Sequence, residues 1–515
     1  MTVRVFSGAV VGLDAFPIEV EVDATPGLHL FSIVGLPDKT VEESRDRIQA
    51  ALRNSGFVAP KQKNQRIIVN LAPADVKKEG SGYDLPIAIG YLVTTKQLAA
   101  VPRSTLMVGE LGLDGSVRRI NGILPLVSMA KSRGFKEILV PADNAAEASM
   151  VRGVAVISIA TLAEAVGHLS GKKPVIACEP MRISDLDRSG FLEDAEITMN
   201  DIRGQESAKR ALTVAASGGH NILMHGPPGS GKTLLAKALA GILPPLSEDE
   251  ALEITKIYSV AGMTTNTPLI TRRPFRNPHH TTSAIAIIGG GSWPRPGEVT
   301  LAHRGVLFLD EIPEFPRSVI EALRQPMENG EVTIARANTT VRFPARFMLV
   351  AAMNPCPCGN FGSEKQVCSC TGFAISKYQK KLSGPILDRI DIQLGVSHET
   401  YAKLATAPKA ADKGNDERLR ALILNARNIQ QDRYGKSKRH LNSELGPREV
   451  LRYCAMTGDA EHLMEMAVTT NNLSGRAYHK LLKLSRTIAD LEKTSSINSS
   501  HVGEAISYRI KAENI

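Results

Sequence analysis

The stretch of residues 226–233 constrains the fold of this chain more than any other. It reads GPPGSGKT and matches the pattern G-x-x-x-x-G-K-[ST]. The apolar run NILMH precedes it, and the helix-forming run LLAKALAGIL follows it. A buried strand that runs through such a loop into a helix directs backbone N–H groups and the positive end of the helix at a phosphate. The sequence therefore predicts a parallel α/β sheet that binds a nucleoside triphosphate.

Every residue of this loop is a candidate contact to ATP. Lys232 is expected to reach the β- and γ-phosphates, and the Thr233 hydroxyl is expected to bind Mg²⁺. The other six candidates form the loop that surrounds the phosphates: Gly226, Pro227, Pro228, Gly229, Ser230 and Gly231.

Two adjacent carboxylates complete the expected hydrolytic site. The apolar run VLFL is followed directly by Asp310 and Glu311, about 80 residues after the loop. An NTPase needs one carboxylate in the Mg²⁺ shell and one that polarises the attacking water. We assign Asp310 to the first role and Glu311 to the second.

Three further polar residues extend this pattern. Asn354 ends the strand-like run FMLVAAM, where it can orient water or contact the γ-phosphate. Arg389 lies among apolar residues in SGPILDRIDIQL, and Arg476 begins a helix in LSGRAYHKLLKLSR. Residues 199–515 thus resemble the AAA+ ATPases, with Asn354 as sensor 1, Arg389 as arginine finger and Arg476 as sensor 2. The resemblance implies a ring in which Arg389 completes the site of the next subunit.

The first of two insertions lies within residues 272–305. Its segments PFRNPHHT and GEVTLAHRG are similar to the AAA+ subunit of magnesium chelatase. The glycine run with Trp293 and Arg295 predicts a hairpin, and Trp293 either stacks on a base or packs under its own loop. The neighbouring His279 and His280 are expected to diverge in extended backbone, which disfavours a shared metal site.

The second insertion, residues 328–347, alternates like two strands joined by a turn. A hairpin at this place also occurs in MCM helicases, where it reaches into the central channel. Arg336, Asn338 and Arg342 would then contact DNA phosphates without reading the base sequence. The alternative is a solvent-exposed hairpin with ordinary surface arginines.

The N-terminus and the hydropathy bear on location. No apolar run approaches the ~18 residues that span a bilayer. The start, MTVRVFSGAVVGLDAF, lacks the apolar core and cleavage site of a signal peptide. We therefore expect a cytoplasmic protein without membrane contact, in a compartment that keeps thiols reduced.

Four of the six cysteines cluster in residues 356–370. Cys356, Cys358, Cys368 and Cys370 form the pattern C-x-C-x₉-C-x-C. In a reducing compartment such a cluster favours a tetrahedral Zn²⁺ site that closes a small knuckle. An iron–sulfur cluster and a metal-free loop remain open as alternatives.

The 515-residue chain divides into four segments. Residues 1–170 alternate short strand-like and helix-like runs, and residues 171–198 read as a linker. Residues 199–395 hold the parallel-sheet core with the insertions and the knuckle, and residues 396–515 read as a helical lid. The net charge of +9 permits a nucleic-acid partner without requiring one.

The N-terminal segment resembles the protease domain of Lon. The resemblance rests on IIVNLAPADVKKEGSGYDLPIAIGYL and MVGELGLDGSVRRINGI. The Lon serine and lysine align with Gly82 and Leu124; Ser81 lies one residue from the first position, but no lysine lies between Lys96 and Lys131. Because a serine without a base is a poor nucleophile, we predict a non-proteolytic α+β domain that serves ring assembly or DNA handling.

Taken together, the N-terminal domain, PFRNPHHT and the CPCG…CSC knuckle resemble the bacterial ComM (YifB) family. The resemblance implies a homo-hexameric DNA helicase that drives branch migration while transforming DNA is integrated. Its expected cofactors are ATP, Mg²⁺ and Zn²⁺, and its expected partners are single-stranded and branched DNA and recombinase-associated proteins. The alternatives are a chelatase-type motor that remodels a protein partner and a Lon-like ATP-dependent protease.

Overall fold

The chain forms two compact units. The computed structural model describes residues 2–181, 197–265, 269–291, 294–336, 339–362, 366–399, 415–435, 441–470 and 472–509. The N-terminal unit comprises Met1–Arg188, Glu248–Ile270 and Ala337–Arg342. The P-loop unit comprises Ser189–Ser247, Thr271–Arg336 and Phe343–Ile515.

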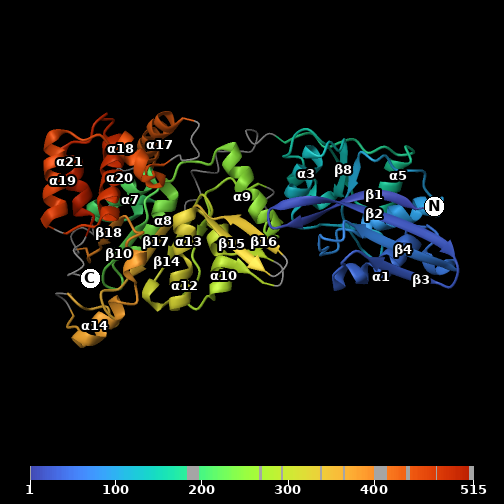
Figure 1. Cartoon of the computed structure of the whole chain (residues 1–515), viewed down its shortest axis with the longest axis horizontal. Helices are drawn as coiled ribbons and strands as arrows, with labels where there is room; N and C mark the ends of the chain where they lie inside the picture. Colours follow the sequence, from blue (N-terminus) through green and yellow to red (C-terminus); the bar gives the residue numbers. More distant parts are fainter. Residues whose placement is uncertain are drawn as a thin grey trace. The chain divides into compact units, whose positions relative to one another are not determined.

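The N-terminal unit is built on a seven-stranded mixed sheet of order β3-β4-β2-β1-β5-β8-β9 (Figure 1). The pairs β1–β2 and β2–β4 are antiparallel, and the other neighbours are parallel. In β2, the buried residues Ile18, Val20 and Val22 alternate with partly exposed glutamates, the period of a strand with one face on a core. The strands are β1 (Val3–Val11), β2 (Asp14–Pro26), β3 (Leu30–Val34), β4 (Gln65–Ala72), β5 (Thr105–Met107), β8 (Glu137–Pro141) and β9 (Ala155–Ile159), with a small hairpin of β6 (Glu110–Leu111) and β7 (Val117–Arg118).

Helices pack against both faces of this sheet, and each face has its own hydrophobic core. One core contains buried residues of α1 (Lys39–Asn54), α2 (Asp84–Thr94) and α5 (Leu162–Leu169). The other contains those of α3 (Ile123–Ser132) and α4 (Ala145–Ala148). The result is a helix–sheet–helix sandwich.

A later part of the chain also belongs to the N-terminal unit. Helix α9 (Glu248–Val260) packs on α3, where the N–H of Gly122 donates to the carbonyl oxygen of Ser259 at 3.0 Å. Arg119 donates to the Thr264 hydroxyl at 2.7 Å and pairs with Glu147 at 2.9 Å. The segment that follows the P-loop helix is thus held by polar contacts and is not a free loop.

The P-loop unit has a five-stranded parallel sheet of order β11-β14-β17-β10-β18. Because β10 lies between β17 and β18, the carboxyl ends of three strands meet beside the glycine-rich loop. The strands are β10 (Ile222–His225), β11 (Phe275–Arg276), β14 (Val306–Leu309), β17 (Met348–Met353) and β18 (Ile392–Gly395).

Both insertions form two-stranded hairpins. β12 (Gly289–Gly290) pairs with β13 (Arg295–Pro296), and β15 (Glu331–Arg336) pairs with β16 (Thr339–Pro344). The helices around the sheet are α7 (Glu206–Gly218), α8 (Lys232–Ile242), α10 (Ala284–Ile288), α11 (Glu298–Leu301), α12 (Arg317–Ala322), α13 (Arg324–Asn329), α14 (Gly372–Gln379) and α15 (Gly384–Leu387).

The C-terminal part of this unit is helical and shares one core with the sheet. Helix α20 buries Leu481, Leu484 and Ile488 at three- and four-residue spacing. Beside them the buried Asp490 accepts from Arg433 and Arg486, which fixes α17 to α20. The helices, red in Figure 1, are α17 (Asn415–Tyr434), α18 (Pro447–Tyr453), α19 (Gly458–Thr470), α20 (Gly475–Leu491) and α21 (Ser499–Ser507).

The predicted fold class is confirmed. The chain combines a mixed α/β N-terminal unit, a parallel P-loop sheet, a helical C-terminus and a cysteine cluster between β17 and α14. Within the described ranges, no helix is both long enough and apolar enough to cross a membrane.

Candidate active site and cysteine cluster

The loop between β10 and α8 owes its shape to glycines. Gly229 and Gly231 have φ of +74° and +88°, a left-handed conformation that residues with a side chain rarely adopt. A Cβ on Gly226 would lie 2.0 Å from the carbonyl oxygen of Val396, so no larger residue fits where the loop leaves the sheet. Because α8 begins at Lys232, the loop lies at a helix N-terminus, which favours an anion.

Lys232 is almost fully buried at the base of this loop. Its Nζ donates to the carbonyl oxygens of Gly226 and Pro227 at 2.7 and 2.9 Å and to Oδ1 of Asn354 at 3.2 Å. Burial lowers the pKa of Lys232, and the two carboxylates after β14 act in the opposite direction. All three hydrogen-bond acceptors are uncharged, so the ammonium charge is available to phosphate oxygens.

Asp310 lies next to Thr233, the other residue expected to bind Mg²⁺. Asp310 follows the last residue of β14, and its Oδ2 accepts from the Thr233 hydroxyl at 2.9 Å. These two oxygens are close enough to bind one ion, and both are of the hard type that Mg²⁺ prefers. The residues therefore fit Mg²⁺, which, when bound with ATP, neutralises phosphate charge.

Glu311 has an unusual backbone conformation. Its φ is +49°, in the left-handed region, which costs a residue with a side chain about 1 kcal/mol or more. Its side chain is exposed, and the Asn354 amide nitrogen lies 3.5 Å from its Oε1. Such strain clusters at functional sites, which agrees with the water-activating role assigned to Glu311.

Asn354 connects the two halves of the site. It follows β17, which lies between β10, the strand before the Lys232 loop, and β14, the strand before Glu311. Its side chain contacts both residues. The structure therefore brings together the predicted lysine, carboxylates and sensor asparagine. Their catalytic roles remain predictions.

Both predicted arginines influence Glu328 in α13, but only Arg389 forms an ion pair with it. Arg389 donates through Nη2 to Glu328 and through Nη1 to the carbonyl oxygen of Pro385 at 2.7 Å. Its Nε is buried without a hydrogen-bond partner among the described residues. Arg389 lowers the pKa of Glu328, and the exposed Arg476 adds an effect of the same sign. The role of Arg389 in a neighbouring subunit stays a prediction, because this chain holds it in an ion pair of its own.

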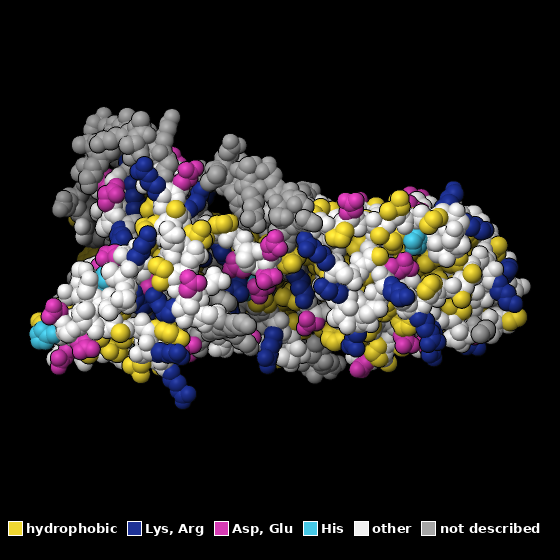
Figure 2. Space-filling model, turned by 90° about the horizontal axis from the view of Figure 1, so that it is seen from above, with side chains coloured by type: hydrophobic (Ala, Val, Ile, Leu, Met, Phe, Trp, Pro, Cys, Tyr) yellow, Lys and Arg dark blue, Asp and Glu magenta, His cyan; other side chains and the backbone are white. Residues whose placement is uncertain are grey.

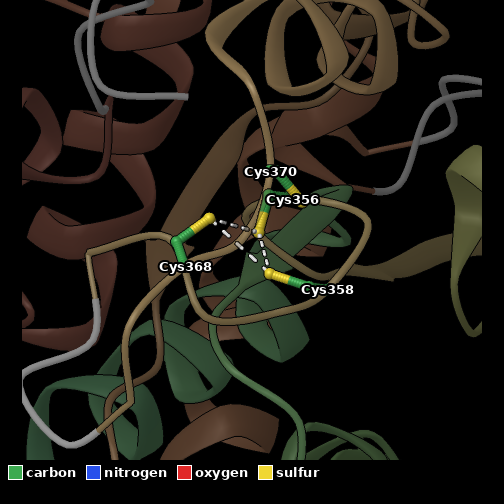
Figure 3. Close-up of side chains that lie close together, drawn as sticks. All are labelled: Cys356, Cys358, Cys368 and Cys370. Carbon is green, nitrogen blue, oxygen red and sulfur yellow. Dashed lines mark hydrogen bonds between the residues drawn. The ribbon is translucent and has the colours of Figure 1, made fainter.

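The four clustered cysteines surround one point (Figure 3). The sulfur of Cys356 lies 3.4 Å from that of Cys358 and 3.7 Å from that of Cys368, and the last two lie 3.6 Å apart. All four sulfur atoms, including that of Cys370, lie within 4.8 Å of one another. Four sulfurs about 2.3 Å from a tetrahedral ion would be about 3.8 Å apart, so the residues fit a single metal ion.

The chemistry of the cluster also suits a metal. Backbone N–H groups, first that of Asn360 and then that of Ser369, lower the pKa of the Cys358 thiol to about 5. Backbone N–H groups also act to lower the pKa values of Cys368 and Cys370, but burial and the neighbouring thiols outweigh them, so both pKa values are raised. The thiolate is the form that binds metal. An iron–sulfur cluster places its cysteines on different iron atoms, which requires wider spacing. By contrast, burial raises the pKa of the isolated Cys454 to about 11, which makes it unreactive.

The structure describes only part of the predicted DNA contacts. Trp293 and Asn338 lie outside the described residues, as does the side chain of Arg336, whose backbone ends β15. Arg295 on β13 and Arg342 on β16 are exposed. These two arginines are available to a ligand in the described chain.

The flank of the second hairpin is partly covered. Val341 of β16 is only 5% exposed. Val341 lies against Gly12, in the turn between β1 and β2. A Cβ added to Gly12 would lie 2.3 Å from Cγ1 of Val341. The return strand therefore has a packed side at Val341 and an exposed side at Arg342, as strand alternation requires.

The two positions that align with the Lon serine and lysine lie near the starts of helices. Gly82 precedes α2 and Leu124 lies in α3. The Ser81 hydroxyl donates to a carboxylate oxygen of Glu110 and so has an acidic partner. Lys78, the nearest lysine in sequence, is buried and bonds to the carbonyl oxygen of Pro73.

Sequence reasoning missed two features and was wrong on one. It did not find Glu328, because nothing in a sequence pairs an acid with an arginine 61 residues away. It also did not single out His225, next to the P-loop, whose pKa is lowered by burial and by Lys232. The expectation that His279 and His280 diverge is wrong: a turn brings their ring centroids to 4.1 Å.

Comparison with known families agrees with this architecture. The model "Magnesium chelatase, subunit ChlI" matches residues 198–404. The models "Subunit ChlI of Mg-chelatase" and "Magnesium chelatase, subunit ChlI C-terminal" match residues 20–144 and 414–509. This magnesium-chelatase-like AAA+ architecture implies ATPase activity with ATP and Mg²⁺.

Individual relatives are similar over almost the whole chain. The competence protein ComM of Haemophilus influenzae is 42% identical over 509 residues, which cover 98% of this chain and 97% of the relative. Protein YifB of Escherichia coli is 39% identical over 506 residues, 98% and 96% of the two chains. The magnesium-chelatase 38 kDa subunit of Cereibacter sphaeroides is 24% identical over 61% of this chain and 91% of its own length. The chain therefore belongs to the ComM (YifB) family of magnesium-chelatase-like AAA+ ATPases.

Proposed function

We propose that this protein is an ATP-driven DNA translocase that promotes branch migration while transforming DNA is integrated by recombination. The observation that carries the proposal is the 42% identity to a competence protein over 98% of the chain. This identity spans the N-terminal unit, the ATP site and the cysteine cluster together. The ATP site supplies a source of energy for movement along DNA.

Contact with DNA is assigned to the two hairpins. Arg295 and Arg342 are exposed, and cations repeated around a ring would bind phosphates of any sequence. On the face drawn in Figure 2, Lys and Arg side chains are dispersed among Asp and Glu, so this face is not a continuous basic surface. We therefore assign DNA binding to local loops and not to a broad basic face.

The active form in this proposal is a homo-hexamer. Arg389 leaves Glu328 and reaches the ATP of the adjacent subunit, which makes hydrolysis depend on assembly. Single-stranded and branched DNA are the substrates, and recombinase-associated proteins are further partners. The N-terminal unit assists assembly or DNA handling without proteolysis.

The cysteine cluster holds Zn²⁺ in this proposal, and the protein acts in the cytoplasm, where thiols stay reduced. The sulfur spacing of 3.4–3.7 Å among three of the ligands supports one tetrahedral ion. Metal analysis of the purified protein should find one zinc and no iron per chain. An equivalent amount of iron with visible absorbance would assign a different metal.

The decisive experiment is unwinding of a synthetic three-strand branch with ATP, beside a linear duplex. We expect strand release from the branch, ATP hydrolysis stimulated by single-stranded or branched DNA, and a steep loss of both with salt. The Lys232→Ala variant is the control for ATP dependence. ATP hydrolysis that no DNA structure stimulates would contradict the proposal.

A second candidate function is a chelatase-type motor that remodels a protein partner. It is favoured by the chelatase family models, which match three segments of the chain. This function predicts ATP hydrolysis stimulated by a protein and indifferent to DNA. Pull-down with ATP, with and without nuclease, separates the two: a partner that survives nuclease treatment favours the motor.

A further inference from the structure

The cysteine knuckle, of which residues 356–362 and 366–370 are described, contacts the phosphate-binding loop at Gly359. Gly359, between the first cysteine pair and the rest of the knuckle, is buried. A Cβ at this position would lie 2.6 Å from both Cγ and Cδ of Pro228, the third residue of the loop. The knuckle backbone therefore touches the Pro228 ring, and no side chain fits between them.

A second connection joins the knuckle to the ATP site through the backbone. Only Pro355 separates Asn354, which contacts Lys232, from Cys356. The carbonyl oxygen of Pro355 accepts from Gln379 of α14 at 3.3 Å. The sulfur of the fully buried Cys356 accepts from a backbone N–H of the knuckle at 3.3 Å. The first metal ligand and the sensor asparagine are thus parts of one packed segment.

Among its described residues, 356–362 and 366–370, the knuckle contains no helix or strand. Figure 3 shows its cysteines at the ends of a loop, and the helix that follows, α14, begins only at Gly372. A small loop of this kind takes its fold from the metal that its thiolates share. Metal binding at the cysteines should therefore fix the position of Gly359.

We propose that the metal-bound knuckle positions the phosphate-binding loop through the contact between Gly359 and Pro228, so that occupancy of the four-cysteine site by a thiophilic divalent ion sets the affinity for ATP. The inference rests on the proposed ATPase activity and metal site, and is independent of DNA. Loss of the metal weakens ATP binding and leaves the catalytic carboxylates in place. Gly359 is a positioning residue in this scheme, since it acts through Pro228.

Two glycines of the knuckle provide a matched test. Gly359 and Gly362 have nearly equal φ, +82° and +76°, so alanine causes similar backbone strain at either position. A Cβ on Gly362 meets no atom of the described residues within 4 Å, whereas one on Gly359 meets Pro228. The Gly359→Ala variant should bind a fluorescent ATP analogue about tenfold more weakly, with a rise in KM that exceeds any fall in kcat. The Gly362→Ala variant should bind it within twofold of the parent protein.

A third variant distinguishes contact from misfolding. Pro228→Ala removes the two ring atoms that a Cβ on Gly359 would meet. The double variant Gly359→Ala/Pro228→Ala should therefore bind the analogue more tightly than Gly359→Ala alone, a coupling that a double-mutant cycle measures. Equal weakening by both glycine variants, or no coupling in the cycle, would overturn the role of the contact.

Metal removal tests the other half of the inference. Zinc release by a chelator, followed with a colorimetric metal indicator, should weaken binding of the ATP analogue about tenfold, and added Zn²⁺ should restore it. Unchanged ATP affinity in metal-free protein that stays folded by circular dichroism would overturn the inference. Because the assay contains no DNA, this failure differs from a failure of translocation, and Lys232→Ala shows separately whether the ATP site itself is correct.

Discussion

Two regions of the molecule place a charged residue at the start of a helix beside a sheet, and they differ in whether its partners are charged. In the P-loop unit, the ammonium of Lys232 is held by two backbone carbonyls and an amide oxygen. In the N-terminal unit, the carboxylate of Asp84 at the start of α2 is buried against Arg47 at 2.7 Å. The first charge is directed at a ligand, and the second is neutralised within the fold.

This difference shows that two α/β units with similar elements can differ in whether a charged side chain remains available to a ligand. Both units offer strand ends and helix starts, but the charged group at the helix start has uncharged partners in the P-loop unit and an oppositely charged partner in the N-terminal unit. In the N-terminal unit, even the Ser81 hydroxyl has an acidic partner, Glu110. The contrast predicts that substitutions in the two regions affect different measurements.

The largest effect is expected from Lys232→Ala. Without the ammonium, the loop loses the buried cation that is expected to contact the phosphates, and ATP binding and hydrolysis should fall below detection. Equilibrium binding of a fluorescent ATP analogue measures the loss. The Ser81→Ala variant is the control from the N-terminal unit and should hydrolyse ATP at the parent rate. A similar loss of hydrolysis in this variant would contradict the difference between the two units.

Arg389→Ala should leave ATP binding within about twofold and reduce hydrolysis about 10³-fold, as expected of an arginine finger. Mixing this variant with Lys232→Ala subunits should restore part of the activity. At some interfaces the Arg389→Ala subunit then supplies an intact ATP site, and the Lys232→Ala subunit supplies the intact Arg389. Steady-state phosphate release measures both effects. A mixture with no recovery would place Arg389 in its own subunit, beside Glu328.

Glu311→Gln keeps the size of the side chain and removes its basicity. We expect ATP to bind normally and hydrolysis to fall about 10²-fold, the usual contribution of a general base. A single-turnover assay separates the chemical step from binding. The control is Glu314→Gln, which alters an exposed pair with Lys381 in the same segment and should change the rate little.

Arg47→Ala should have the smallest effect on ATP and a clear effect on stability. It leaves the fully buried Asp84 without its positively charged partner and should destabilise the N-terminal unit by about 3 kcal/mol, with ATP affinity unchanged. Hydrogen exchange of α2 in urea reports the loss, and Arg45→Ala, exposed on the same helix, is the control. A fall in ATP affinity would contradict the division between the regions.

The same variant has a predicted pH dependence. Burial raises the pKa of Asp84, and Arg47 opposes this rise. Removing Arg47 therefore raises the pKa in the folded state further above its unfolded value. The stability deficit should be small below about pH 4, where Asp84 is protonated in both states, and should grow as the pH rises.

The sequence was informative where chemistry requires a local pattern. The P-loop, the two carboxylates after β14 and the C-x-C pairs all follow from short spacings, and the structure brings each set together. The fold class also follows, because the strand and helix periods differ and alternate along the chain. These features depend on neighbours in sequence.

What the sequence did not reveal depends on neighbours in space. The ion pair of Arg389 with Glu328 and the contact of Gly359 with Pro228 join residues 61 and 131 positions apart. The proximity of the His279 and His280 rings depends on a turn that the run PFRNPHHT does not specify. Tertiary packing sets these contacts, and a single sequence carries no record of it.

The polypeptide passes between the two units after residues 188, 247, 270, 336 and 342, five times in all. Deleting residues 1–170 would remove α3, the helix against which α9 packs, and would expose the apolar side of α9. The activity of a shortened ATPase fragment would then reflect this damage and not the contribution of the deleted residues.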